Sequence, residues 1–142
     1  MIVLDTTILL YAAGDDHPLR DPCRRVFAAV TDGRLSATST PAVVQEFAHV
    51  RARRRDRGEA AAVARHFATV LAPLLGSTER ELEPALALFE SNPALDAFDS
   101  FLAAAAIGAG ATAIVSADRA FADVPGIRHV DPGTPELDAL LR

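Results

Sequence analysis

The hydrophobic pattern at the start of the chain predicts a buried strand that runs directly into a helix. Residues 2–4 are strongly apolar, Asp5 and two threonines follow, and residues 8–11 are apolar again at a spacing that suits a helix. Ligands of open parallel α/β sheets bind at the carboxyl ends of strands, so Asp5 would project into a site. A simple helix cap formed by Asp5 or Thr6 explains the same stretch equally well.

A second stretch of the same design lies far along the chain. Residues 113–116 form a short apolar run that leads into Asp118, so a predicted buried strand is again followed by a carboxylate. This repetition favours a functional role for Asp5 over capping alone. Further short strands are predicted at residues 35–39, 73–75 and 127–130.

Helical patterns fill the intervals between these strands. Thr78 and Glu81 have the spacing of a capping box, although Pro84 predicts that this helix starts later than the cap. Alternating strands and helices predict a three-layer α/β/α fold with a short central parallel sheet of about four to five strands, in a single domain over residues 1–142. The predicted helices cover residues 7–13, 22–30, 59–71, 78–89, 95–108 and 135–141, and another begins at Thr40-Pro41.

The predicted helix at residues 95–108 contains a carboxylate, Asp99, among alanines and large apolar side chains. An unpaired buried carboxylate is costly unless a metal, an arginine or a water-filled cleft compensates for it. Asp96 lies on the same face three residues earlier, where the helix dipole favours a carboxylate. Asp99 is therefore interpreted as functional, and Asp96 as a cap or supporting group. The large apolar residues expected to be buried here are Phe98, Phe101, Leu102 and Ile107.

The helix after Thr40 carries Glu46, and a dense run of arginines follows it. Taken alone, Glu46 is best explained as a solvated helix carboxylate, paired with Arg53 or Arg54. The arginines are expected at the turn of a helical hairpin, and such charge runs usually face solvent. The functional alternative is phosphate binding, which suits the planar fork of arginine.

Composition limits the remaining interpretations. The chain has 142 residues, half of them hydrophobic, which is enough for one domain with a real core. It contains no predicted membrane-spanning segment, no signal peptide, and a single cysteine, Cys23, so we expect a cytoplasmic protein without membrane contact. The net charge of −5 argues against a nucleic-acid partner, but the arginine run concentrates positive charge in one segment.

Four of these carboxylates are expected to converge. Right-handed crossovers bring Asp5 and Asp118 to one edge of a parallel sheet, and the helices that carry Glu46 and Asp99 can reach the same edge. Such a cluster would repel itself strongly unless cations lay between its members. Oxygen ligands suit Mg²⁺ or Mn²⁺, and a site of this kind activates water for phosphodiester cleavage.

Together these pieces resemble the PIN-domain ribonucleases and, within them, the VapC-type toxins of bacterial toxin–antitoxin pairs. The matching segments occur in the family's order and span nearly the whole chain. They are Val-Leu-Asp-Thr-Thr at residues 3–7, Val-Gln-Glu at 44–46, Asp-Ser-Phe-Leu-Ala-Ala-Ala at 99–105 and Val-Ser-Ala-Asp-Arg-Ala-Phe at 115–121.

The resemblance implies a Mg²⁺-dependent endoribonuclease that acts as a toxin. It makes Asp5 and Asp99 the principal Mg²⁺ ligands, with Glu46 and Asp118 completing the acidic set, and Mn²⁺ as the other candidate ion. Asp96 is an addition to the family's usual pattern. The hydroxyl positions implied to support the metal site are Thr6, Thr7 and Ser116.

The resemblance also implies partners. Proteins of this kind are typically homodimers that cut a particular RNA, and an antitoxin protein wraps them. The arginine-lined hairpin is the natural surface for either partner. The candidate contacts for RNA or antitoxin are Arg51, Arg54 and Arg55.

Two alternatives stay open from the sequence. One is a catalytically degenerate domain of the same fold that only binds RNA or protein. The other is a phosphoryl-transfer domain of the haloacid-dehalogenase or receiver type, with Asp5 as nucleophile. Both of those families use a lysine, which this chain lacks.

Overall fold

A computed structural model describes residues 1–142 and contains one sheet of four parallel strands in the order β2-β1-β3-β4. The predicted parallel α/β architecture is therefore confirmed. The two central strands are fully buried, because helices cover both faces of the sheet. The strands are β1 (Ile2–Leu4), β2 (Ala37–Thr38), β3 (Ala113–Val115) and β4 (Arg128–Val130).

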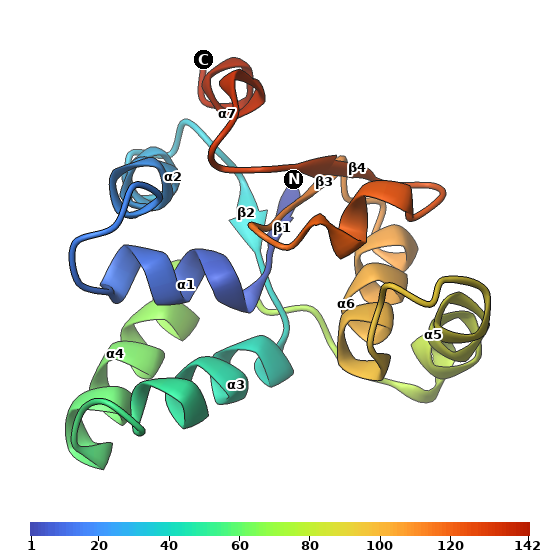
Figure 1. Ribbon diagram of the computed structural model, residues 1–142, viewed down its shortest axis with the longest axis horizontal. Coiled ribbons are helices and arrows are strands. Elements are labelled where there is room, and N and C mark those ends of the chain that lie inside the picture. Colours follow the sequence, from blue (N-terminus) through green and yellow to red (C-terminus); the bar gives the residue numbers. More distant parts are fainter.

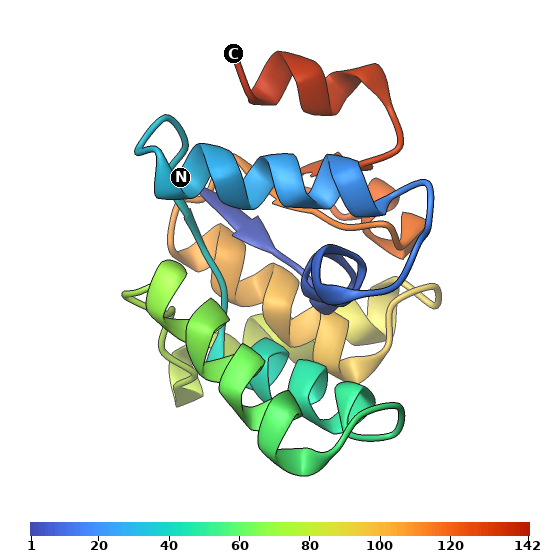
Figure 2. The same cartoon turned by 90° about the vertical axis from the view of Figure 1, so that its left-hand side faces the viewer.

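Helices form the outer layers. In Figure 1, α1 and α2 lie to the left of the sheet and α5 and α6 to its right, while Figure 2 shows α3 and α4 as an antiparallel hairpin below α1. None of the helices is long and apolar enough to span a bilayer. The helices are α1 (Thr6–Ala13), α2 (Arg20–Thr31), α3 (Pro41–Arg51), α4 (Arg57–Val70), α5 (Glu79–Ser91), α6 (Ala97–Gly108), the 3-10 helix η1 (Arg119–Asp123) and α7 (Pro135–Leu140).

Local sequence signals explain where several helices begin. The side chains of Asp5, Thr40, Asp56 and Asp96 each accept a hydrogen bond from a backbone N–H of the first turn that follows, as N-cap residues do. Proline is the first residue of α3, where its missing N–H costs nothing.

The predicted strand at residues 73–75 is wrong. The segment runs beside β2, but its only backbone bond to that strand's end joins Leu75 N to Ser39 O at 2.8 Å. The Thr38 hydroxyl donates to the carbonyl of Pro73 at 2.8 Å. Proline has no N–H to donate, so a regular ladder cannot form along so short a segment.

The predicted delay in the start of α5 is also wrong. The helix begins at Glu79, directly after the capping box in which Glu81 Oε2 accepts from the Thr78 backbone N–H at 2.9 Å. Pro84 lies inside the helix on its exposed side. The reciprocal cap fixes the helix start, and the proline removes one hydrogen bond further along without moving it.

The core joins the sheet to the inner helices. Phe47 of α3 and Phe121 of η1 are completely buried, as are Ile2, Leu4 and Ile114 of the strands. Two burial predictions fail: Phe98 is 78% exposed and Ile107 is 36% exposed, although Leu102 on the same face as Phe98 is buried. The first turn of α6 lies at the rim of a cleft, where no other element covers it.

Candidate active site

Asp5 stands at the centre of the carboxyl edge of the sheet. Its side chain is buried, and its Oδ2 accepts hydrogen bonds from the Thr7 backbone N–H at 3.3 Å, the Thr7 hydroxyl at 2.8 Å and the Ser116 hydroxyl at 2.7 Å. No hydrogen bond is made to Oδ1. Asp5 therefore caps α1 and also lines the cleft, so the cap leaves the side chain available for a role at the site.

The hydroxyls of Thr7 and Ser116 tie β1 to β3. The Ser116 hydroxyl accepts from the Asp118 backbone N–H at 2.9 Å, and the Thr7 hydroxyl accepts from the Ala117 backbone N–H at 3.0 Å. Because each hydroxyl has already donated its single proton to Asp5, the network has a defined direction. These two predicted hydroxyls thus hold the Asp5 carboxylate in place.

Glu46 reaches the cleft from the exposed side of α3. Its Oε2 accepts from the Thr6 hydroxyl at 2.6 Å, which places the third predicted hydroxyl beside a second carboxylate. The suggested ion pair with Arg53 or Arg54 is wrong, because Glu46 takes part in no ion pair and Arg53 bonds to His49 instead. Arg53 and Arg54 lie beyond the end of α3, seven and eight residues after Glu46, and neither lines the cleft.

The surroundings of Asp99 disfavour the charged form of its carboxyl group. Its carboxylate accepts no hydrogen bond, and its backbone N–H donates to Asp96 Oδ1 at 2.7 Å. Burial raises the pKa of the Asp99 carboxyl to about 7 from an ordinary 3.8, and the nearby negative charges add to the rise. Those charges belong to Asp5, Asp96, Asp118 and Glu46, in decreasing order of effect.

The predicted acids thus lie near one another, with different exposure. Asp5, Glu46 and Asp99 line one cleft of about 380 Å³. Asp118 is exposed just outside it, where its Oδ1 caps η1 through the Ala120 backbone N–H at 2.8 Å. Asp96 is the N-cap of α6, as its position suggested. No arginine forms an ion pair with any of the five acids.

The donor set fits a hard divalent cation. Asp5 Oδ1 and both oxygens of Asp99 are free of hydrogen bonds and border the same cleft. No three His, Cys, Asp or Glu side chains are close enough together to form a ready-made cage. Mg²⁺ is usually held by one or two carboxylates, with waters and substrate phosphates as its other ligands, so a complete cage is not required.

Thiol chemistry finds no support at this site. Burial raises the pKa of the Cys23 thiol to about 12, and the charge of Asp131 adds to this effect. Cys23 belongs to α2, is completely buried in the core and does not line the acidic cleft.

Two of the three candidate arginines are occupied inside the molecule. Arg51 donates from Nε and Nη2 to the Glu59 carboxylate and from Nη1 to the carbonyl of Ala13 at 2.7 Å. Arg55 donates to Asp15 at 2.9 Å. Arg54 makes no ion pair or hydrogen bond through its side chain. It is therefore the arginine of this set that can bind a phosphate without breaking an internal contact.

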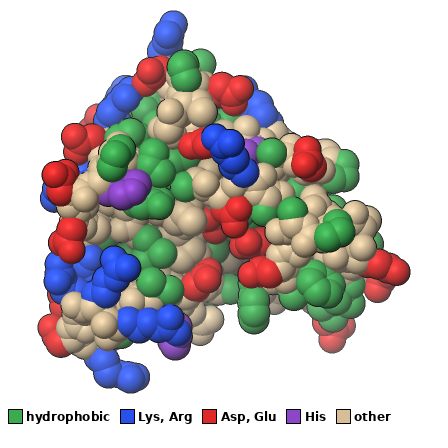
Figure 3. Space-filling view, viewed as in Figure 1, with side chains coloured by type: hydrophobic (Ala, Val, Ile, Leu, Met, Phe, Trp, Pro, Cys, Tyr) green, Lys and Arg blue, Asp and Glu red, His purple; other side chains and the backbone are tan.

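These arginines border a groove rather than the acidic cleft. The groove, of about 320 Å³, is also lined by Thr7, Tyr11 and His17. Thr7 connects the groove to the acids through its bond to Asp5. Figure 3 shows acidic side chains gathered near the middle of this face and basic side chains at its left-hand edge.

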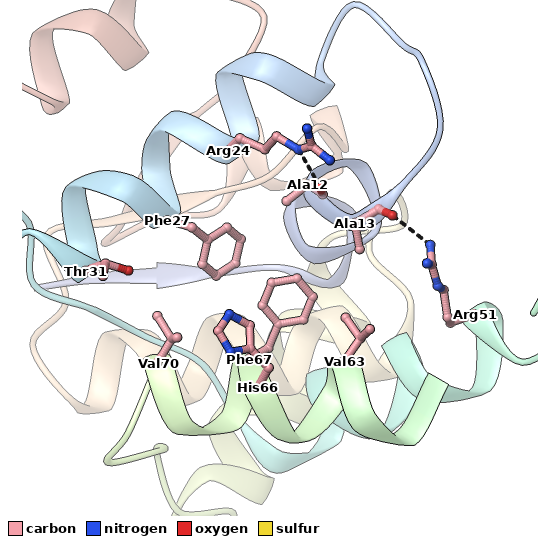
Figure 4. Close-up of a pocket in the computed structure, with 10 residues that line it drawn as sticks. All are labelled: Ala12, Ala13, Arg24, Phe27, Thr31, Arg51, Val63, His66, Phe67 and Val70. Atoms are coloured by element: carbon pink, nitrogen blue, oxygen red, sulfur yellow. Dashed lines mark hydrogen bonds between the residues drawn. The ribbon is translucent and has the colours of Figure 1, made fainter. Parts of the chain in front are cut away.

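A further cavity of about 300 Å³ lies between α2 and α4 (Figure 4) and is lined mainly by apolar side chains such as Phe27 and Phe67. At its rim, Arg24 and Arg51 donate to the carbonyls of Ala12 and Ala13. These carbonyls belong to the last turn of α1, where no further helical N–H is available. The two arginines therefore cap α1 from outside the helix.

Two residues of the acidic cleft were not predicted. They are His49 of α3 and Phe98 of α6, which both line the cleft. Helical spacing could have placed His49 near Glu46, because the two are three residues apart on α3. No sequence signal separates an exposed Phe98 from the buried residues around it.

Comparisons with known proteins agree with this geometry. The profile of the PIN domain matches residues 2–127. Ribonuclease VapC7 from Mycobacterium tuberculosis is 52% identical over 145 residues, which cover 99% of this chain and 98% of the relative.

A solved structure supports the same fold. The crystal structure of VapBC2 from Rickettsia felis, bound to a DNA fragment from their promoter, superposes with a TM-score of 0.73 over 92% of this chain and 98% of that chain. Its sequence identity is 16%, so the likeness concerns the fold. The motif resemblance found in the sequence is thereby confirmed, and the chain belongs to the PIN domain family.

Proposed function

We propose that this chain is an endoribonuclease that hydrolyses RNA phosphodiester bonds with Mg²⁺ or Mn²⁺, and that it is the toxin of a toxin–antitoxin pair. The observation that carries this proposal is the set of acids around Asp99, which no arginine neutralises. The relative called Ribonuclease VapC7 supports the reaction class, and the VapBC2 structure supports an antitoxin partner.

The proposed roles follow from the contacts. Asp5 Oδ1 and the Asp99 carboxylate hold the ion, while Glu46 and Asp118 orient water or add charge at its periphery. Ser116 and Thr7 fix the Asp5 carboxylate by hydrogen bonds. Thr6 fixes Glu46 in the same way. A divalent ion in such a site activates water and stabilises the leaving oxygen.

The test is cleavage of total RNA by the purified protein. Asp5→Asn and Asp99→Asn each change the charge without the shape, and both should lower cleavage by at least 10²-fold, as should EDTA. Glu83→Gln is the matched control, because Glu83 is an exposed carboxylate of α5 with no hydrogen bond. RNA binding without cleavage at any Mg²⁺ or Mn²⁺ concentration would favour the degenerate binding domain instead.

The partner proposal has its own test. We infer that the protein forms a homodimer and that an antitoxin covers the arginine-lined hairpin. Arg54 is the proposed contact, since Arg51 and Arg55 are engaged in internal ion pairs. Co-expression with the protein encoded beside this gene should give a stable complex that has lost RNA cleavage. Full cleavage by that complex would contradict the proposal.

A further inference from the structure

Phe98 is an exposed aromatic side chain beside the acids. It is 78% exposed, more than any other large hydrophobic residue of the molecule. It immediately precedes Asp99 in the first turn of α6 and lines the same cleft. An exposed phenylalanine in this position loses hydrophobic stabilisation, so packing does not explain its location.

Two kinds of side chain line the cleft. The acids Asp5, Glu46 and Asp99 provide the charged part, which suits a cation and an anion bound to it. The rest of the lining is largely apolar and includes Leu102 of the core. The apolar residues are Ala42, Val43, Phe98, Phe101 and Leu102.

A nucleotide has the same two halves, a phosphate and a flat apolar base. We propose that Phe98 stacks on a base of single-stranded RNA next to the phosphate that is cut. This inference rests on the proposed function and adds a positioning residue to it. The phenyl ring offers no hydrogen bond, so it would accept a base of any sequence and fix its position rather than its identity.

A protein partner is the competing occupant of Phe98. Other large exposed apolar side chains on this side of the sheet do not line the cleft: Leu82, Leu86 and Phe89 of α5, and Ile107 of α6. Phe98 instead shares the cleft with the groups proposed to hold the reacting phosphate. RNA must reach those groups to be cut, and this shared location is the ground for proposing RNA. An inhibitory antitoxin would cover the same groups, so the experiment below includes a protein interface as one of its outcomes.

The experiment uses a short phosphorothioate RNA that resists hydrolysis and carries 2-aminopurine, a base whose fluorescence is quenched when it stacks. Binding and quenching are measured for wild type, Phe98→Ala, Phe98→Leu and Phe98→Trp. The control is Phe89→Ala, which removes another exposed phenylalanine from outside the cleft. We expect wild type, the tryptophan variant and the control to bind and quench alike.

The alanine and leucine variants should bind about 10- to 100-fold more weakly, as expected for the loss of one base stack, and should lose the quenching. Their KM for RNA should rise more than their kcat falls. Leucine that binds as tightly as phenylalanine would show that only apolar contact matters and would overturn the proposal. Unchanged RNA binding in Phe98→Ala, with a changed oligomeric state or antitoxin affinity, would assign Phe98 to a protein interface.

The experiments distinguish failure of the proposed nuclease function from failure of the stacking inference. If wild type binds RNA but never cleaves it, the nuclease proposal fails, while the Phe98 comparison still reports on stacking. If wild type cleaves RNA and all Phe98 variants bind it equally, the nuclease proposal stands and the stacking inference fails.

Discussion

Asp5 shows how one residue serves folding and the proposed chemistry together. A single carboxylate oxygen takes all three internal hydrogen bonds, including the bond that caps α1, and leaves the other oxygen to the cleft. The sequence offered capping and function as alternatives, because a carboxylate after a strand is compatible with either. Only side-chain geometry could show that the two oxygens divide these tasks.

The stability of the metal-free protein should depend on Asp99. Its folded-state pKa of about 7 lies above the ordinary 3.8, so the folded state holds this proton more tightly than the unfolded state. Stability from this residue is complete below about pH 4, falls as the unfolded chain loses the proton, and reaches its minimum above pH 7. Raising the pH thus costs stability.

Replacing Asp99 with Asn removes that pH dependence. We expect the free energy of unfolding of Asp99→Asn to exceed that of wild type by about 1–4 kcal/mol at pH 8, since one pKa step is worth about 1.4 kcal/mol. The gain should shrink toward pH 4. Urea unfolding in EDTA between pH 4 and pH 8 measures this difference in unfolding free energy. Mg²⁺ should raise the melting temperature of wild type but not that of Asp99→Asn. A constant difference at every pH would contradict the assignment.

Arg51 and Arg54 should behave differently despite being neighbours. The Arg51 side chain is only 14% exposed and binds Glu59 and the end of α1, so Arg51→Ala should destabilise the protein by about 1–3 kcal/mol. Arg54→Ala should leave the melting temperature unchanged. The Arg54→Ala substitution should weaken RNA binding, and the salt dependence of the RNA affinity should fall by about one released counterion. Thermal melts and RNA titrations at several salt concentrations separate the two roles.

At the scale of elements, the spacing of hydrophobic residues and the helix-capping residues predicted most of the helices and strands. The run at residues 2–4 and the Thr40-Pro41 start appear where expected. The failures have a common origin. The segment at residues 73–75 looks like a strand but lacks donors for a ladder, and Phe98 looks like core but lies past the last covering element. Sequence patterns describe a segment, whereas these outcomes depend on its neighbours.

Helix α5 carries an apolar stripe that no element of this chain covers. Leu82, Leu86 and Phe89 are each about half exposed and recur at helical spacing. Such a stripe is typical of a surface that meets a partner, and the proposed homodimer would supply one. Leu86→Glu should therefore convert a dimer into a monomer in light scattering without lowering the helix content.

Substitution of an exposed polar residue of α5 outside the apolar stripe is the control. Glu83→Gln should leave the oligomeric state unchanged. If Leu86→Glu does the same, the homodimer uses another surface, or the stripe belongs to a different partner.

At the scale of the whole molecule, the site depends on strands that are distant in the sequence. The Ser116 hydroxyl bonds to Asp5 across 111 positions, and β1 lies between β2 and β3 in the sheet. The acids of the cleft likewise come from β1, α3 and α6. The sequence placed Asp5 and Asp118 at strand ends, which the rule for parallel strands then brought to one edge. It placed Glu46 and Asp99 on helices that can reach the same edge.

Removing β3 should therefore prevent folding. A chain that ends at Gly110 loses both β3 and β4, leaves one side of β1 unpaired, and should show no cooperative thermal transition. A chain that ends at Thr134 loses only α7 and keeps the whole sheet, so it should melt cooperatively at a lower temperature. Circular dichroism melts compare the two. Cooperative melting of the shorter chain would show that β1 and β2 form a stable unit without β3.

The long separation between Asp5 and Ser116 has a consequence for synthesis of the protein. Until β3 has left the ribosome, the nascent polypeptide contains most of its carboxylates but cannot fix Asp5 between two strands. A cell that translates this message would thus meet the assembled form of the proposed nuclease only after most of the chain has been made. Translation that stops early would release a fragment in which the candidate site is not assembled.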